Sequence, residues 1–174
     1  MGAVAQRKDT PDSLVDIYVK ITGKKQGFIK GEVVTPTHAG EIQAVWYRWG
    51  VVQGFSTQGL PTGKRQLGKF MFLMASQLAT PKLLSAGATN ESLTQVVISC
   101  NKMSNGKLNE YMKWTLTNAS VAEVKTGYLA PDQIIPFDEV SMVFQKIQLE
   151  YKPQNPDGSQ GAGVMFSDDM AMSV

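Results

Sequence analysis

The residues able to do chemistry are few and scattered in this chain. It contains a single histidine, His38, and a single cysteine, Cys100. A catalytic nucleophile needs an adjacent base and a third group that orients the base, and His38 is the only imidazole. Glu41 lies three residues later and would occupy the opposite face of one strand. We therefore expect no catalytic site, and we interpret His38 and Glu41 as fixing a turn or touching a partner.

Metal sites fail the same test of residue type and spacing. A zinc site takes about four ligands from Cys, His, Asp and Glu, and one histidine with one cysteine cannot form a His/Cys cluster. The acidic pair Asp168-Asp169 follows a glycine-containing stretch near the end of the chain. Exposed acids are the norm in proteins, so we interpret this pair as solvated charge. The sequence predicts no metal.

The glycine-rich connection after residue 52 does not match a phosphate-binding or nucleophile motif. The glycines of residues 59–63 stand one position too close for a phosphate-binding loop, and Lys64 is followed by Arg65 instead of Ser or Thr. Residues 54–59 are one position too long for the nucleophile elbow. Lys64, Arg65 and Lys69 form a small basic cluster, interpreted first as a solvated loop tip and second as a contact for an acidic partner. We expect no cofactor and no enzymatic activity.

Composition describes one globular domain without a strong net charge. Of 174 residues, 43% are apolar and 18% charged, which is typical of a folded chain. Lys and Arg outnumber Asp and Glu by only 17 to 15, so nothing indicates nucleic acid or an anionic membrane as a partner. The longest apolar run, residues 70–75, is too short to span a bilayer. The first 13 residues lack a signal-peptide core, so we expect synthesis in the cytoplasm and export, if any, without a cleaved leader.

The elements that must position these residues are mostly strands. Residues 15–21 alternate between apolar and polar, which predicts a half-buried strand. Residues 42–49 are apolar on both faces, and residues 70–75 form a short apolar strand. Thr80-Pro81 predicts a helix start and Gly87 its end, with Leu83 and Leu84 facing the core.

The second half of the chain predicts further strands and one irregularity. Residues 93–100 and 111–117 are strands joined across Asn105-Gly106, a strong hairpin signal. In the last long strand the apolar positions shift phase between Phe144 and Ile147. Such a slip requires a β-bulge or a strand that passes from one sheet to another, and we place it at Gln145-Lys146. The pattern favours an all-β barrel or sandwich with one flanking helix.

Four stretches in sequence resemble the haemolysin-coregulated protein (Hcp) family, which forms the inner tube of the bacterial type VI secretion system. They read IYVKITGKKQG, THAGEIQAVWYRWGVVQ, GKFMFLMASQLATPKLLSAGATN and FDEVSMVFQKIQLEYKPQNPDGSQGAG. Each motif alone is weak, but the four occur in order over about residues 15–166. The resemblance implies a mostly β fold: a β-barrel of two packed antiparallel sheets with one short flanking α-helix, similar to phage tail-tube proteins.

The resemblance also implies a function in assembly instead of catalysis. Members close into homohexameric rings that stack into a tube, which a contractile sheath propels with a spike protein at its tip. Some members carry secreted effectors in the ring lumen. The implied partners are therefore further copies of the chain, the spike, the sheath and effectors, with secretion through the type VI apparatus and no membrane insertion. We expect a flexible N-terminal extension over residues 1–13, a single domain over 14–166 and a tail over 167–174.

Individual residues receive roles from this interpretation. Arg48 points away from its aromatic neighbours and is a candidate for the ring lumen. The barrel core is predicted to include Val45, Tyr47, Trp49, Trp114, Ile147, Leu149 and Tyr151. The long connection at residues 53–68 would reach the neighbouring ring. Candidates for contacts between subunits or between rings are His38, Glu41, Trp46, Gln58, Leu60, Lys64 and Arg65.

Two alternatives remain open at this point. One is a tail-tube protein from another phage-like contractile particle, which genomic neighbours would distinguish. The other is a small enzyme or a small ligand-binding β-barrel such as a lipocalin-like carrier, which would be a monomer with a bound small molecule.

Overall fold

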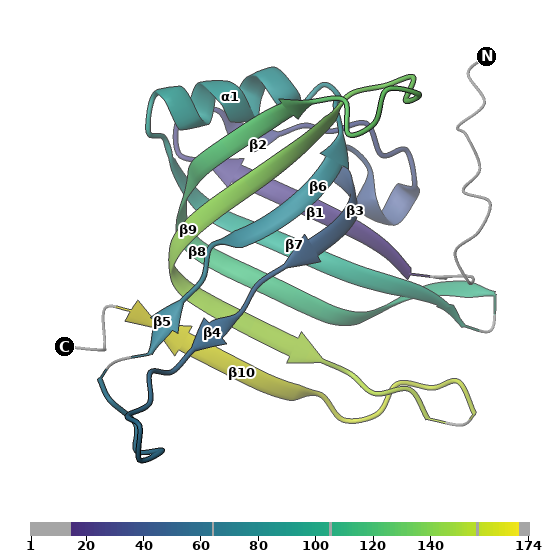
Figure 1. Cartoon of the computed structure of the whole chain (residues 1–174). Helices are drawn as coiled ribbons and strands as arrows, with labels where there is room; N and C mark the ends of the chain where they lie inside the picture. Colours follow the sequence, from purple (N-terminus) through teal and green to yellow (C-terminus); the bar gives the residue numbers. More distant parts are fainter. Residues whose placement is uncertain (1–14, 64, 105, 156, 171–174) are drawn as a thin grey trace.

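The computed structural model describes residues 15–63, 65–104, 106–155 and 157–170, and these form a closed antiparallel β-barrel with a helix across one end (Figure 1). The strands of the barrel follow the order β9-β6-β3-β1-β7-β8, and β8 pairs again with β9 to close it. The mostly β barrel with one flanking α-helix is therefore confirmed. The elements are β1 (Val15–Gly23), β2 (Gly27–Ile29), the 3-10 helix η1 (Pro36–His38), β3 (Ile42–Arg48), β4 (Val51–Val52), β5 (Gln66–Leu67), β6 (Phe70–Ala75), α1 (Thr80–Ala88), β7 (Ser92–Ser104), β8 (Lys107–Gly127), β9 (Phe137–Tyr151) and β10 (Val164–Asp169).

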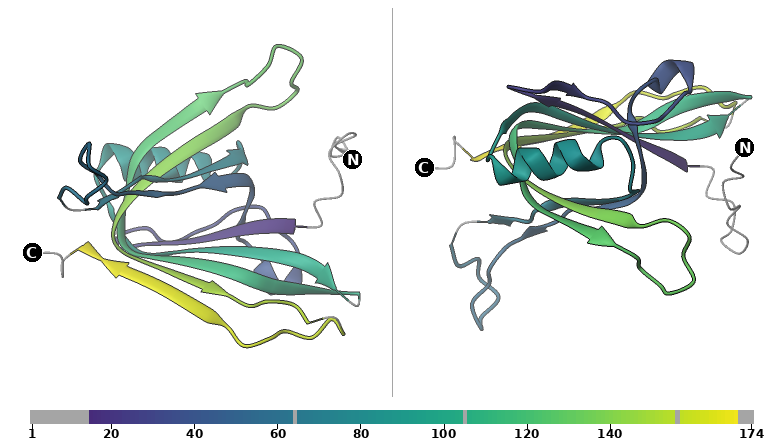
Figure 2. Two further views of the ribbon diagram at one scale, coloured as in Figure 1. Left: turned by 60° about the horizontal axis from the view of Figure 1, so that its bottom comes forward. Right: turned by 90° about the horizontal axis from the view of Figure 1, so that it is seen from above.

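Four short strands lie outside the barrel ring. β2 adds to the edge of β1, and β10 adds to the second half of β9. β4 and β5 form a separate two-stranded ribbon that extends away from the barrel (Figure 2).

The predicted hairpin turn is confirmed. Ser104 of β7 pairs directly with Lys107 of β8, which leaves Asn105-Gly106 as a two-residue connection. Gly106 has a φ of 71°, a left-handed conformation that glycine adopts without steric cost. Beyond the turn, β8 runs unbroken to Gly127, ten residues past the end of the predicted strand over residues 111–117.

The predicted phase slip in β9 is also confirmed. Phe144 and Ile147 are both buried, although they are an odd number of positions apart. The first half of β9 pairs with β6 and the second half with β10. On the neighbouring strand Asn118 has a φ of 49°, and its amide donates a 2.8 Å hydrogen bond to Gln145 Oε1. The two strands bend together at this corner.

A bulge in β3 corrects the prediction for Val45. Ala44 pairs with Met74 and Trp46 with Leu73, so Val45 is the extra residue of the pair. Such a bulge exchanges the two faces of the strand. Ile42 and Ala44 point into the core before it, whereas Tyr47 and Trp49 pack against the core after it. Val45 is only half-buried and is not part of the core cluster.

The helix differs from its prediction at both ends. Ala79 occupies the N-cap position and Thr80 is already helical. Gly87 lies inside the helix, and the chain leaves it only near Asn90, which has a φ of 50°. Leu83 is buried as expected, but Leu84 is 41% exposed, because the buried positions of the helix follow a spacing of three to four residues.

Most predicted core residues lie in or against the core, with one further exception. Trp114 and Ile147 are buried, and Tyr47, Trp49 and Leu149 pack against the core from its margin. Tyr151 is 42% exposed and is therefore not a core residue. It lies on the same side of β9 as Ile147, but the strand extends past the depth of the packed interior, where Tyr151 meets Tyr111 edge to face.

The end of the chain also departs from the prediction. β10 continues to Asp169, which pairs with Lys146, so residues 167–169 belong to the sheet and not to a tail. The predicted N-terminal extension over residues 1–13 and the final residues 171–174 lie outside the described residues.

Candidate functional site

His38 and Glu41 form a contact within the chain. His38 Nδ1 lies 2.9 Å from Glu41 Oε2, and both side chains are more than four-fifths buried. The imidazole stacks on Tyr18, with ring centroids 4.1 Å apart. Burial raises the pKa of the Tyr18 hydroxyl. These contacts hold the loop before β3 onto β1, which favours the turn-fixing interpretation over a partner contact.

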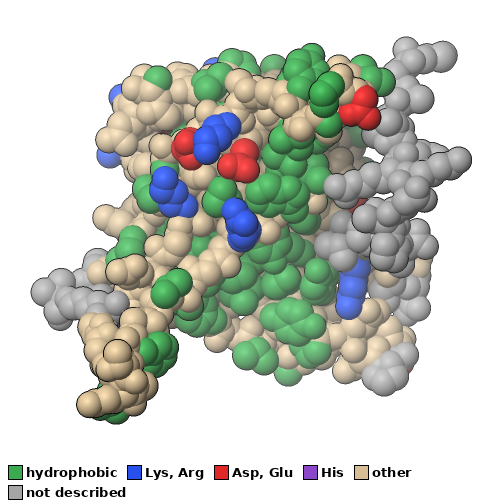
Figure 3. Space-filling model, in the orientation of Figure 1, with side chains coloured by type: hydrophobic (Ala, Val, Ile, Leu, Met, Phe, Trp, Pro, Cys, Tyr) green, Lys and Arg blue, Asp and Glu red, His purple; other side chains and the backbone are tan. Residues whose placement is uncertain are grey.

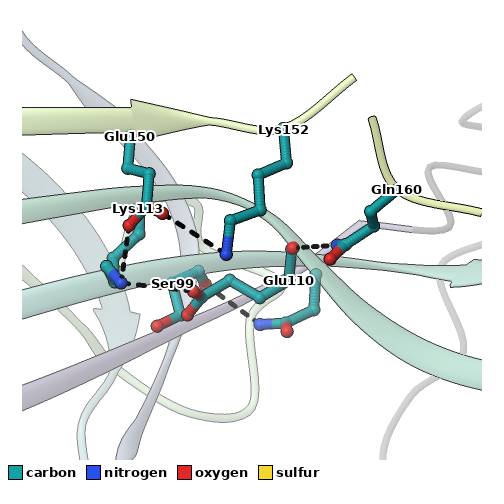
Figure 4. A network of polar contacts seen from close by, with 7 residues as sticks. Ser99, Glu110, Lys113, Glu150, Lys152 and Gln160 are labelled. Atoms are coloured by element: carbon teal, nitrogen blue, oxygen red, sulfur yellow. Dashed lines mark hydrogen bonds and ion pairs between the residues drawn. The ribbon is translucent and has the colours of Figure 1, made fainter. Parts of the chain in front are cut away.

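A polar network covers the outer side of β7, β8 and β9 (Figure 4), and we call this surface the β7–β9 face. Lys113 Nζ lies 2.8 Å from Glu150 Oε2, and Lys152 Nζ lies 3.3 Å from Glu150 Oε1. Glu110 makes a longer contact of 3.7 Å with Lys113. The hydrogen bond from Lys113 lowers the pKa of Glu150 and raises that of Lys113. The charges on this face are therefore balanced within the chain.

The outer side of β3 and β6, here called the β3–β6 face, is apolar in contrast. Phe70, Phe72 and Met74 point into the core, so Met71 and Leu73 between them point outward. Met71 is partly exposed, whereas Leu73 is 5% exposed and is covered by its neighbours on this side. Trp46 pairs with Leu73 across the two strands. Figure 3 shows hydrophobic side chains gathered over these strands, beside charged side chains over β8 and β9. Trp46, a predicted contact residue, is thus partly exposed and has apolar neighbours on this face.

Arg48 lies on the same outer side, away from Tyr47 and Trp49, as predicted from alternation. Its side chain is exposed and its Nη2 lies 3.9 Å from the sulfur of Met71. Thioether sulfur is a weak acceptor, so this contact leaves the guanidinium able to bind another group. Whether Arg48 faces a ring lumen stays a prediction.

The described residues of the predicted long connection form a hairpin, which we call the arm (residues 51–63 and 65–67). Thr62 N donates to Gly54 O at 2.8 Å, and Ser56 N donates to Leu60 O at 2.8 Å. Leu60 at the tip is 62% exposed, and Gln58 beside it is also exposed. Both predicted stacking residues thus lie on an apolar, projecting tip.

A second projecting segment escaped the sequence analysis, namely the β8–β9 loop (residues 128–136). Its large apolar side chains are all at least half exposed, and Ile134 reaches 87%. Figure 1 places this loop and the arm at opposite ends of the barrel, and Figure 2 shows that both project to the same side. The sequence YLAPDQIIP contained the signal, because four large apolar residues between strands have no core to fill.

The basic cluster is only partly as predicted. Lys64 lies outside the described residues. Arg65 is not a solvated tip residue, because its guanidinium forms a two-fold ion pair with Asp168 of β10. Asp168 is correspondingly not solvated charge: its side chain is 9% exposed, and hydrogen bonding from Arg65 lowers its pKa.

The interior offers aromatic packing instead of reactive groups. Tyr47 stacks on Phe70, and both rings meet Trp114 edge to face, with ring centroids about 6 Å apart. Burial raises the pKa of Tyr47 to about 12 and that of Cys100 to about 11, so both remain protonated at neutral pH. Among the described residues no three side chains of His, Cys, Asp or Glu converge as metal ligands. No helix in the described part of the chain is long and apolar enough to cross a membrane.

Comparison with known proteins finds one consistent family. The family model described as "Type VI secretion system effector, Hcp" matches residues 18–151. "Protein hcp1" of Pseudomonas aeruginosa is 29% identical over 152 residues, which cover 86% of this chain and 90% of that protein.

Solved structures show the same fold. Hcp1 from Salmonella typhimurium matches with a TM-score of 0.72 and 25% identity, over 90% of this chain and 95% of that one. A mutant Hcp1 from E. coli EAEC 042 matches with a TM-score of 0.74 and 21% identity, over 88% and 97% of the two chains.

Proposed function

Because the chain belongs to the Hcp family of type VI secretion proteins, we propose that it is a tube protein whose copies close into hexameric rings. The rings then stack into the inner tube that the secretion system expels. In this proposal the working parts of the molecule are its surfaces, and the free energy of assembly comes from apolar area buried between copies.

The observation that carries the proposal is the apolar β3–β6 face. A closed ring is a heterologous assembly, in which each copy uses two different complementary surfaces. Stable interfaces bury about 800 Å² on each partner and are centred on aromatic anchors. Trp46, with Leu73 and Met71 around it, fits the centre of one of these surfaces.

Stacking of rings is proposed for the two projecting segments. A tube requires contacts between the two ends of successive rings, and the arm and the β8–β9 loop lie at opposite ends of the barrel. Leu60 and Ile134 expose apolar side chains there. Removal of such side chains from water on stacking is favourable at about 25 cal/mol per Å².

Arg48 is proposed to face the ring bore, where it would contact effectors. The support is its exposure on the outer side of β3, next to the proposed subunit interface. Arg48→Glu should reduce effector capture in a pulldown while hexamers remain intact by native mass spectrometry. Unchanged capture with intact rings would contradict this assignment.

The remaining partners follow from the same proposal: a contractile sheath around the tube, a spike at its tip, and effectors inside, with export of the protein itself. No enzymatic step and no cofactor are part of this function. The alternative of a ligand-binding barrel is disfavoured because side chains from every barrel strand fill the interior, whereas carriers need an open cavity. A tube protein of another contractile particle would use the same surfaces, and neighbouring sheath, spike or capsid genes would distinguish the two.

Electron microscopy with native mass spectrometry tests the proposal. We expect rings with a central hole and a particle of about six times the 19.0 kDa chain. Trp46→Glu should give monomers with an unchanged far-UV spectrum, while Trp46→Phe should still form rings. A wild-type protein that stays monomeric at high concentration would contradict the proposal.

A further inference from the structure

The arm joins the barrel through a narrow base made of two glycines. Gly68 N donates a 2.9 Å hydrogen bond to Gly50 O. A Cβ on Gly68 would lie only 3.0 Å from that oxygen, so a side chain there is disfavoured. The ribbon above this base is short: β4 and β5 pair at Val51–Leu67 and Val52–Gln66, and an isolated bridge joins Phe55 to Pro61 farther out. An isolated two-stranded ribbon is marginally stable, so the base alone does not determine the angle of the arm.

An ion pair connects the arm to β10. Arg65 Nε donates to Asp168 Oδ2 at 2.5 Å, and Arg65 Nη2 donates to Asp168 Oδ1. The two residues are 103 positions apart in the sequence. Asp168 pairs within the sheet with Ile147, a fully buried core residue. The carboxylate is therefore held by the barrel, while the guanidinium belongs to the arm.

The geometry of this pair suits a bracing role. A bidentate arginine–carboxylate contact restricts orientation as well as distance. Trp49 adds a second support at the base, since its Nε1 donates to Gly68 O at 3.1 Å and its ring lies 6.2 Å from that of Phe166 in β10. Trp49 holds the base of the arm, and Arg65 acts farther along it.

We propose that Arg65 and Asp168 are positioning residues that set the angle of the arm relative to β10. The pair presents the tip, with Gln58 and Leu60, in the orientation that the next ring accepts. This inference rests on the proposed stacking of rings. Loss of the pair leaves the barrel and the hexamer intact and lets the arm swing about Gly50 and Gly68.

The first test measures the arm directly and does not depend on stacking. Spin labels are placed at Gln58→Cys in the arm and Gln95→Cys on β7, and labelled chains are diluted with unlabelled ones so that each ring carries one pair. Cys100 is buried and stays unlabelled in the native state. We expect one narrow distance distribution in the parent, and a broad one after Arg65→Ala or Asp168→Asn.

The matched control is Lys69→Ala, which removes one positive charge from the same segment without removing this pair. It should keep the narrow distribution, and Arg65→Lys should give an intermediate width because it retains charge but not the two-fold contact. A narrow distribution in both Arg65→Ala and Asp168→Asn would overturn the inference. A broad distribution in Lys69→Ala would also overturn it, because net charge would then explain the effect.

The second test measures stacking. Arg65→Ala hexamers should keep the thermal midpoint of the parent. The protein concentration at which they form tubes should rise about tenfold, which corresponds to about 1.4 kcal/mol for the association of one ring with the next. Normal tubes from Arg65→Ala would overturn the inference. If parent rings themselves never stack, the proposed function fails, while the spin-label distances still decide whether the pair sets the arm.

Discussion

The β3–β6 face and the β7–β9 face belong to the same barrel and follow the same alternation of inward and outward side chains. They differ in the outward side chains, which are paired charges on one face and mainly apolar groups on the other. On the β7–β9 face two lysines, Lys113 and Lys152, balance two glutamates, Glu110 and Glu150. On the β3–β6 face Trp46 and Leu73 lie side by side, and the Arg48 guanidinium contacts the thioether sulfur of Met71.

The difference separates a self-contained surface from one that gains by association. Paired surface charges are stable in water and contribute little net free energy. A cluster of outward-facing apolar side chains loses free energy in water and regains it on contact with a partner. The β3–β6 face is therefore where assembly should be most sensitive to substitution.

The largest effect is expected in the core that both faces share. Trp114→Ala should lower the free energy of unfolding by about 3–5 kcal/mol, since Trp114 packs against Tyr47, Trp49 and Phe70. Urea denaturation followed by circular dichroism measures it. A loss under 1 kcal/mol would mean that the interior is not packed as described.

The next effect separates the two faces. Trp46→Glu should weaken association by 2 kcal/mol or more, about 30-fold, because buried tryptophans dominate interfaces, while the unfolding free energy of the monomer changes little. Analytical ultracentrifugation over a dilution series measures it. Intact rings from this variant would remove the β3–β6 face from the subunit interface.

A smaller effect is expected at the rim of β1. His38→Ala loses the stack on Tyr18 and the contact with Glu41, which should cost about 1 kcal/mol of stability without changing the oligomer. Thermal unfolding measures the stability, and native mass spectrometry measures the oligomeric state. Glu41→Gln is the matched variant, because it changes the other partner of the same contact. Dissociation of rings at unchanged stability would instead place His38 in an interface.

The smallest effect belongs to the β7–β9 face. Glu150→Gln should cost about 1 kcal/mol or less at pH 7. The pKa of Glu150 is lowered in the folded state, so the unfolded chain binds more protons near its usual value of 4.5. The stabilisation is therefore present above that pH and lost as the pH falls through the folded pKa. Denaturation at pH 7 and pH 3.5 measures how much unfolding free energy is lost on acidification, and this loss should be smaller in the variant than in the parent. An equal loss would mean that the ion pairs of Glu150 do not stabilise the fold.

Local patterns in the sequence were sufficient for several features. Asn105-Gly106 predicted its hairpin because a two-residue turn requires φ values that these residues favour. The slip between Phe144 and Ile147 predicted the corner of β9, since side-chain alternation is a property of one strand. The single histidine and cysteine already argued against a His/Cys metal cluster.

Other features depend on residues far apart in the sequence. The pairing of β10, the contact of Arg65 with Asp168 and the exposure of Tyr151 follow from how far each strand extends past its neighbours, which alternation does not encode. The bulge at Val45 depends on the register with β6, so the apolar character of both faces of β3 was visible while the residue that exchanges them was not. Sequence determined the strands, their inner and outer sides and the sharp turns, because these depend on backbone preference and local hydrophobic period. Only the tertiary structure decided which outer side is balanced and which is left apolar, because that depends on the side chains that closure of the barrel brings together.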